Sequence, residues 1–253
     1  MSTLAPEGRV RDCLSVIIPT LRPASELGPL LASLDSDLWP RDEVIVVQAG
    51  VEGREPIDIA GTAHRMRVLF SPRGRGIQLN RGVASSHGDL LLFLHSDSQL
   101  PGDFAGSIRR ACADLRVSLG CFSLAFRPSS RTLDVISLWA NLRTRLFKMP
   151  YGDQGLFCRR EVWEKAGGFQ KAYLMEDVDF VRQCRKSGRI HPLRDRIFTS
   201  PRRYVKYGLW RASVMNHLTL LRYFLGEDDR ALYARYYGHE SLLQRCDNDV
   251  SCR

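Results

Sequence analysis

The 253-residue sequence has no apolar run long enough to cross a bilayer, and it has no paired cysteine motif. No window approaches the roughly 20 apolar residues that a spanning helix needs, and the opening segment MSTLAPEGRVRDC lacks the apolar stretch of a secretory signal. The seven cysteines are widely spaced and odd in number, which argues against a disulfide framework and against a zinc site. We therefore expect a cytoplasmic protein, either soluble or peripheral at the inner face of the membrane.

Internal repeats and low-complexity segments are also absent, which favours one domain with an elaborated C-terminal half. Charge is unevenly divided, because residues 1–126 hold 13 Lys and Arg against 14 Asp and Glu, whereas residues 127–253 hold 24 against 14. A basic half favours an anionic partner such as phosphate, nucleic acid or a lipid surface. A solvated basic face fits the same counts equally well.

Short apolar runs alternate with amphipathic segments in the first half of the chain. Continuous apolarity between polar or Gly and Pro residues predicts strands covered on both faces, and the runs are 14–18, 44–47, 66–70 and 90–94. Helical spacing predicts helices over 24–34, 78–86 and 104–114. This alternation predicts a doubly wound α/β sheet.

The pattern changes after Gly120. Residues 121–126 alternate loosely, which predicts a strand with one less buried face. Further helices are predicted over 133–148, 161–166 and 177–187.

Polar side chains stand where three of the predicted strands end. They are Thr20, which follows Pro19, together with Gln48, His95, Ser96 and Asp97. Open α/β sheets bind ligands beyond these carboxyl ends, so we expect the side chains to share one cleft. The carboxylate of Asp97 suits Mg²⁺ or Mn²⁺ and the imidazole of His95 suits Mn²⁺, which predicts a metal and diphosphate site. Alternatively, Asp97 only N-caps the turn that begins at Ser98.

A loop rich in glycine and arginine, SPRGRG, follows the third strand and precedes a helix. Backbone N–H groups at a helix start and guanidinium groups such as Arg75 favour phosphate, although an ordinary connection has the same composition. Asn80, one turn into this helix, faces either the cleft or solvent. Late in the chain, the adjacent cations Arg202 and Arg203 are placed to neutralise the negative charge of a leaving diphosphate.

The segment YGDQG joins a helix to a short apolar run. Its Tyr151, Asp153 and Gln154 offer hydrogen-bonding groups for sugar hydroxyls. A turn whose Asp bonds its own backbone is an equally good interpretation.

Two acids, Glu176 and Asp177, begin a predicted helix in LMEDVD. Their default role is to stabilise the positive end of the helix. Because apolar residues precede them, partial burial is also expected, and an acid in that setting can act as a general base. Asp179 points elsewhere around the helix and is interpreted as structural.

Taken in order, six segments resemble the family 2 glycosyltransferases, which have the GT-A fold. They are SVIIPT (15–20), GRG with QLN (74–80), LLFLHSDSQLP (91–101), YGDQGLFCRR (151–160), GGF (167–169) and LMEDVDF (174–180). The resemblance is nearest to a bacterial subgroup labelled arsenosugar-biosynthesis glycosyltransferases, a label that says little about substrate. It implies a mostly parallel, Rossmann-like sheet flanked by helices, with a helical C-terminal extension.

The resemblance also implies an inverting, hexosyltransferase-like transfer of a sugar from a nucleotide diphosphate sugar to an acceptor hydroxyl. Asp97 matches the last acid of the metal-binding DxD motif, His95 stands in place of its first acid, and Asp177 matches the catalytic base, with Glu176 beside it. Mn²⁺ or Mg²⁺ is the implied cofactor. Other donor-side residues would be Pro19, Thr20, Gln48, Arg75, Asn80, Ser96, Asp153, Arg202 and Arg203, and acceptor-side residues Tyr151 and Gln154.

Departures from the family pattern leave the nucleotide open. Gln48 replaces an acid that contacts the base or ribose, Arg22 and Pro23 replace an Asn-Glu pair, and the QxxRW motif of processive members is absent. A catalytically weak, nucleotide-sugar-binding relative is therefore the alternative. A nucleic-acid-binding protein is disfavoured, because the basic residues are scattered and not interleaved with aromatic residues.

We expect residues 1–203 to form the nucleotide-sugar-binding domain and 204–253 an amphipathic helix and tail packed on it. In 204–225 the residues Trp210, Val214, His217, Leu221 and Phe224 lie near one side of the predicted helix. Such a stripe suits a membrane interface and a lipid-linked acceptor. Packing on the same domain or in a homodimer is the favoured interpretation, and a small-molecule acceptor is equally compatible.

Overall fold

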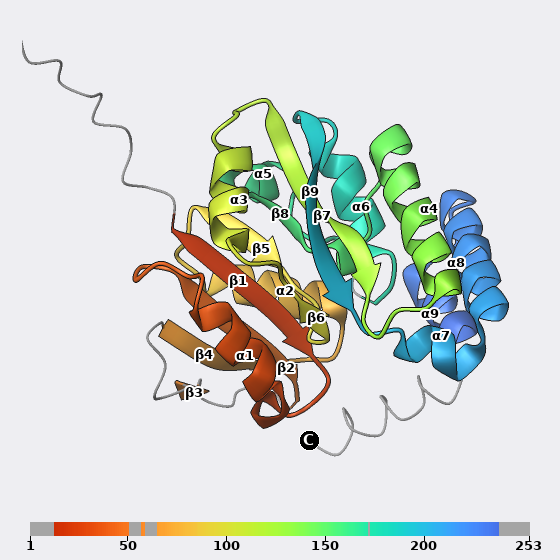
Figure 1. Cartoon of the computed structure of the whole chain (residues 1–253), viewed down its shortest axis with the longest axis horizontal. Coiled ribbons are helices and arrows are strands. Elements are labelled where there is room, and N and C mark those ends of the chain that lie inside the picture. The colour runs from red at the N-terminus through yellow and green to blue at the C-terminus, as the bar shows by residue number, and fades with distance from the viewer. Residues whose placement is uncertain (1–12, 51–56, 59–64, 172, 238–253) are drawn as a thin grey trace, which may run out of the picture.

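The computed structural model describes residues 13–50, 57–58, 65–171 and 173–237 (Figure 1). In these residues one nine-stranded sheet runs in the order β3-β4-β2-β1-β5-β8-β7-β9-β6. The strands are β1 (Leu14–Thr20), β2 (Glu43–Ala49), β3 (Ile57–Asp58), β4 (Arg65–Ser71), β5 (Leu90–Phe93), β6 (Ser98–Gln99), β7 (Val117–Phe126), β8 (Leu156–Arg159) and β9 (Arg189–Thr199). Helices cover both faces of the sheet, which confirms the predicted α/β class.

The four predicted parallel strands form the N-terminal half of the sheet. β1 pairs in parallel with β2 and β5, and β2 pairs in parallel with β4. The helices of this half are η1 (Ala24–Leu27), α1 (Gly28–Asp35), α2 (Arg75–Ala84) and α3 (Phe104–Cys112). Because parallel strands end at the same edge, the loops after β1, β2 and β5 meet there.

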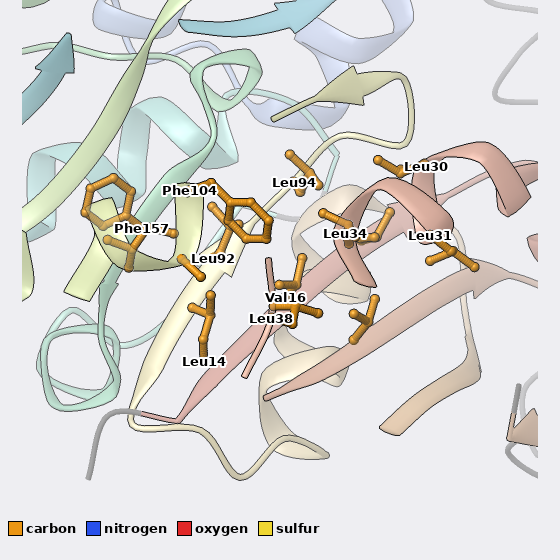
Figure 2. Packing of buried hydrophobic residues seen from close by; sticks show 14 of the residues in the cluster. Leu14, Val16, Leu30, Leu31, Leu34, Leu38, Leu92, Leu94, Phe104 and Phe157 are labelled. Atoms are coloured by element: carbon orange, nitrogen blue, oxygen red, sulfur yellow. The ribbon is translucent and has the colours of Figure 1, made fainter. Parts of the chain in front are cut away.

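Successive residues of β1 point into different cores, as the two-residue period of a strand requires. Val16 and Ile18 lie in a buried cluster with side chains of α1 and α3, whereas Ile17 lies in a second cluster with side chains of α2. Figure 2 shows part of the first cluster, which includes Leu34 and Phe104. Both faces of the central strands are therefore buried, which explains their unbroken apolar runs.

The C-terminal half departs from a parallel arrangement. β8 is antiparallel to β5 and β7, and β7 is parallel to β9. The prediction that 121–126 has a less buried face is wrong, because β7 is buried almost throughout between two strands and beneath α4 (Arg131–Phe147). The remaining helices before the tail are η2 (Gly152–Gln154), α5 (Arg160–Lys165) and α6 (Glu176–Cys184).

The C-terminal segment forms three helices where one was predicted over 204–225. Gly208, with φ of 80°, separates α7 (Arg202–Tyr207) from α8 (Leu209–Phe224), and α9 (Asp229–Tyr237) follows. α8 and α9 pack on α6 through a cluster that contains Val178, Tyr223 and Tyr233.

The stripe predicted to be the packing side of this segment faces outward where the structure describes it. Val214, Leu221 and Phe224 are 53%, 56% and 51% exposed, and His217 is exposed. The side chain of Trp210 lies outside the described residues. In the part of the chain that the structure describes, no helix is long and apolar enough to span a membrane.

Candidate active site

The ends of β1 and β2 are tied together from behind by one buried side chain of α2. The Gln78 amide nitrogen donates hydrogen bonds to the carbonyl oxygens of Thr20, at 2.9 Å, and Val47, at 2.7 Å. Gln78 is 2% exposed. It was not predicted as a site residue, although it is polar at a helical position that faces the sheet.

The side chains of Thr20 and Gln48, both predicted to bind the donor, hold the loop after β1. Thr20 Oγ1 accepts a hydrogen bond from the backbone N–H of Arg22 at 3.0 Å, and Gln48 Oε1 accepts one from that of Ala24 at 3.0 Å. The two residues are register partners on adjacent strands. They therefore shape the rim of the predicted cleft, next to Pro19.

Glu176 and Asp177 begin α6, as predicted, and Arg75 at the start of α2 reaches both of them. The Arg75 guanidinium pairs with Glu176, and its Nη2 lies 3.9 Å from Asp177 Oδ2. Met175, just before the helix, has φ of 62°, a left-handed conformation that a non-glycine residue rarely adopts. The turn thus presents two successive acids to one cation.

The two acids differ in burial. The Glu176 side chain is 0% exposed, and burial raises its pKa to about 7 despite the neighbouring Arg75. The Asp177 side chain is 14% exposed. Its Oδ2 accepts a hydrogen bond from the N–H of Gly152 at 2.7 Å, and its Oδ1 accepts one from that of Val178 at 2.8 Å. Asp177 is therefore the more exposed acid of the pair.

His95 points toward this cluster. Its Nε2 lies 3.2 Å from Arg75 Nη1, so it accepts the hydrogen bond that the always charged guanidinium donates. Burial and the Arg75 charge lower the pKa of His95 to about 3. The imidazole is therefore neutral, and its Nε2 is engaged.

Asp97 lies at the same edge of the sheet, and its side chain is exposed. Partial loss of hydration raises the pKa of Asp97. The nearby charges of Arg22 and Arg75 act to lower this pKa. Because Arg75 interacts with both Asp97 and Asp177, these two predicted acids share one electrostatic neighbourhood. Ser96 is partly buried between His95 and Asp97.

These residues fit a divalent cation only in part. Among the described residues, no group of three or more His, Cys, Asp or Glu side chains is arranged to hold a metal ion. Asp97 alone fits an ion that takes one carboxylate together with diphosphate oxygens and waters. His95 does not fit, because its Nε2 faces the cationic Arg75.

Asn80 was predicted on the donor side, but the structure gives it another partner. Its amide nitrogen donates to the carbonyl of Phe169 at 2.9 Å, and its amide oxygen accepts from the N–H of Phe169 at 3.0 Å. Asn80 therefore fastens α2 to the turn of Gly167 and Gly168. This reciprocal pairing accounts for both of its side-chain groups without a ligand.

The predicted YGDQG loop forms the short helix η2 beside Asp177. Gln154, predicted on the acceptor side, is 1% exposed, accepts from Thr144 Oγ1 at 2.9 Å and donates to the carbonyl of Phe122 at 3.2 Å. A Cβ atom on Gly152 would lie 3.1 Å from His95 Nε2 and 3.2 Å from Asp177 Oδ2. Both distances are shorter than a Cβ atom usually makes, so a side chain at 152 would displace His95, Asp177 or the loop by a few tenths of an ångström.

Tyr151 and Asp153 lie on the other side of this loop. The Arg143 guanidinium stacks 3.6 Å above the Tyr151 ring. Burial raises the pKa of Asp153 to about 6, while the Arg143 charge opposes this shift. Arg143 was not predicted, since nothing in the sequence connects α4 to this loop.

Of the two predicted cations after β9, Arg202 is exposed at the start of α7. The side chain of Arg203 lies outside the described residues.

The chain is similar to known glycosyltransferases. The model of glycosyl transferase family 2 matches residues 15–166, more than half of the chain. No curated protein matches.

Solved structures share the fold at low identity. A mannosyltransferase from Pyrobaculum calidifontis, in complex with GDP-Man and Mn²⁺, is 18% identical with a TM-score of 0.63, over 98% of this chain and 76% of that one. S. aureus TarS 1-349 is 15% identical with a TM-score of 0.55, over 82% of this chain. In complex with UDP-GlcNAc it is 15% identical with a TM-score of 0.54, over 74% of this chain.

The chain spans less than two thirds of these TarS structures, 64% and 58% of their lengths. The fold is that of GT-A glycosyltransferases, as the resemblance implied. Together with the family match, this shows that the chain belongs to glycosyl transferase family 2.

Proposed function

We propose that this protein transfers a hexose from a nucleotide diphosphate sugar to an acceptor hydroxyl, with inversion at the anomeric carbon. The observation that carries this proposal is Asp177, an accessible acid held beside the strand ends by two backbone N–H groups. Solved structures of similar fold contain GDP-Man and UDP-GlcNAc, which supports a nucleotide sugar as donor.

Asp177 would act as the general base. Its two oxygens offer about four lone-pair sites, so two backbone hydrogen bonds leave room for an acceptor hydroxyl. As the acceptor oxygen forms a bond to the anomeric carbon, its proton passes to Asp177. The bond from that carbon to the diphosphate breaks, and its electron pair leaves with the nucleotide diphosphate. A single displacement inverts the configuration.

Glu176 would position Arg75, and Arg75 would in turn hold the start of α2 close to Asp177. Asp97 would hold the diphosphate end of the donor through Mn²⁺ or Mg²⁺, which would neutralise charge on the departing group. Pro19, Thr20, Gln48 and Ser96 would form the rim around the nucleotide. We also assign Arg202 and Arg203 to the diphosphate.

Three finer assignments belong to the same proposal. The motif in residues 91–101 supports an assignment to the subgroup labelled arsenosugar-biosynthesis glycosyltransferases. Residues 1–203 form the catalytic unit and 204–253 an extension that packs on it or on a second copy. The outward apolar side of α8, with Arg211 and Arg222 on the same helix, makes peripheral contact with an anionic membrane.

A thermal-shift screen of UDP-, GDP- and dTDP-sugars with and without Mn²⁺ tests the donor. We expect one nucleotide class to raise the melting temperature, only with the metal, and Asp97→Ala to abolish the shift. Transfer should then require Asp177. A donor shift that persists in Asp97→Ala would contradict the role of Asp97.

The engaged Nε2 of His95 and the structural role of Gln48 favour one alternative, a nucleotide-sugar-binding relative of low activity. Calorimetry would then show UDP or GDP binding without hydrolysis or transfer of the sugar.

A further inference from the structure

A cavity of about 270 Å³ lies beside η2, between β7, α4 and the C-terminal helices. Its walls are apolar and aromatic, and they include Leu124 of β7, Ile136 and Trp139 of α4, and Tyr204 of α7. Ligand pockets begin at about 300 Å³, so this volume suits part of a small molecule. Figure 1 shows α4 and α8 side by side at this edge of the molecule.

The polar end of the cavity is formed by Arg143, Tyr151 and Asp153. Asp153 Oδ1 and Arg143 Nε are both buried, and neither has a hydrogen-bond partner among the residues that the structure describes. Buried polar atoms normally have partners, so these two groups mark a place where a ligand would complete the hydrogen bonding. An acceptor-only carboxylate beside a donor-only guanidinium matches a hydroxyl, which both donates and accepts.

This polar end adjoins the proposed catalytic base. Gly152, which donates to Asp177 Oδ2, directly precedes Asp153 in the chain. The Asp177 charge raises the pKa of both Tyr151 and Asp153, which places all three close together. A hydroxyl held at Asp153 therefore lies near the base that would deprotonate it.

Exposed apolar side chains also lie on the two helices that line the cavity. Beyond the cavity, Leu138 and Leu142 of α4 are 67% and 44% exposed, and Leu218 and Leu221 of α8 are 46% and 56% exposed. Contiguous exposed apolar surface marks binding regions in soluble proteins. These side chains give α4 and α8 exposed apolar surface in addition to the residues that line the cavity.

We propose that this cavity is the acceptor subsite and that it takes an amphiphile, with a hydroxyl at Asp153 and Arg143 and an apolar body against α4. This inference rests on the proposed function and names its acceptor class. It moves Asp153 from the donor side, where the sequence had placed it, to the acceptor side. Tyr151 keeps its predicted acceptor-side role.

The test uses the full chain, the nucleotide sugar that gives the thermal shift, and two acceptors, n-octyl β-D-glucoside and glucose. We expect kcat/KM to be at least about 10-fold higher for the octyl glucoside, since each buried methylene contributes discrimination. Equal values for the two acceptors would overturn the proposal. Binding of the octyl glucoside is followed separately by tryptophan fluorescence, because Trp139 lines the cavity.

Two variants on one helix test the place of binding. Ala140→Trp fills the cavity that Ala140 lines, so the octyl glucoside should bind at least about 10-fold more weakly while the donor thermal shift remains. Leu146→Trp adds the same ring at a position 65% exposed and outside the cavity, and it should bind like the wild type. Equal affinity in Ala140→Trp and the wild type would refute the assignment.

Asp153→Asn retains the size of the side chain and should raise KM for the octyl glucoside without changing the donor shift. Binding of the amphiphile without transfer from any donor would contradict the proposed function, and the acceptor role with it.

The source of the amphiphile is distinguished by presenting a long-chain glucoside in phosphatidylglycerol vesicles. A faster rate there indicates a lipid acceptor, and a faster rate with monomeric octyl glucoside indicates a soluble one.

Discussion

Adjacent acids in this site have different environments, and burial explains the difference. Glu176 has no exposed surface and pairs with Arg75, whereas Asp177 retains some exposure and accepts two backbone hydrogen bonds. The sequence could predict both acids at a helix start, because the charge pattern suits the helix dipole. It could not predict Arg75 as their partner, since 101 positions separate Arg75 from Glu176.

Asp177→Asn should lower the rate of transfer by about 10²–10⁴-fold, the usual contribution of general base catalysis. Donor binding by thermal shift should stay intact, because the amide occupies the same space. Asp179→Asn is the control on the same helix. It weakens the hydrogen bond that Asp179 Oδ1 accepts from the Tyr223 hydroxyl at 2.9 Å, so it should reduce stability and leave the rate per folded molecule unchanged.

Asp153→Asn should make the protein more stable at pH 7.5 and no more stable near pH 4. The pKa of Asp153 is raised to about 6, so the folded state binds this proton more tightly than the unfolded chain. Stability is then lost as the pH rises from about 4 to about 6, and the amide avoids that loss. Arg143, Asp177, Arg75 and Asp97, whose charges act on Asp153, are unchanged in the variant. Urea unfolding at the two pH values measures the difference.

Asp114→Asn serves as a control of opposite sign. Hydrogen bonds from Arg116 lower the pKa of Asp114 to about 2, so this group adds stability above the usual pKa of Asp and loses it as the pH falls toward 2. The variant should be slightly less stable than the wild type at pH 7.5. A stabilising effect there would contradict the ionic account of both residues.

Among the elements, η2 is the one whose position governs the site. Its Gly152 donates to Asp177, its Asp153 lines the proposed acceptor cavity, and a Cβ atom on residue 152 would lie unusually close to His95 and Asp177. The sequence predicted either hydrogen-bonding groups for a sugar or a turn in this segment. It could not predict which residue faces which side, because the contacts of Gln154 with Thr144 and Phe122 come from other elements.

Gly152→Ala should lower transfer by about 10²-fold, because a Cβ atom would push the loop away from His95 and Asp177. Alanine can adopt the backbone conformation of Gly152, so the melting temperature should change little. Gly102→Ala is the control, since a Cβ atom there has no neighbour within 4 Å in the described part of the chain. An active Gly152→Ala enzyme would show that this loop has more freedom than the close approach implies.

Asn80→Leu should lower the free energy of unfolding by about 1–3 kcal/mol, because the N–H and carbonyl of Phe169 would lose their partners. Arg81→Leu, at the exposed neighbouring position, should have little effect. Chemical denaturation of both variants makes the comparison. Similar stabilities would mean that water replaces the lost bonds.

At the scale of the whole molecule, the parallel strands of the first half and the α-helices up to α6 were predictable, whereas β9 was not. Continuous apolar runs at residues 14–18 and 90–94 became β1 and β5, because strands buried on both faces leave a plain signal. β9 gave no such signal, since six of its eleven residues are polar or charged and several are exposed. Its place beside β7 depends on long-range pairing that local patterns do not encode.

The exposed apolar side of α4 and α8 should also govern membrane binding. We expect the protein to sediment with phosphatidylglycerol vesicles more than with phosphatidylcholine vesicles, and Leu221→Glu to reduce the bound fraction several-fold. Leu115→Glu changes a residue that is 66% exposed on a different part of the chain, and it should bind like the wild type. Equal loss in both variants would indicate a general effect of charge.

The amide of Gln78 works as a fixed spacer at the back of the site. Since one short side chain bonds to the ends of both β1 and β2, the distance between those ends is set without help from the loops in front. The loops can therefore change in length and composition while the frame that carries them keeps its dimensions. New donor preferences in this scaffold can arise by exchanging loop residues alone, with no repacking of the interior.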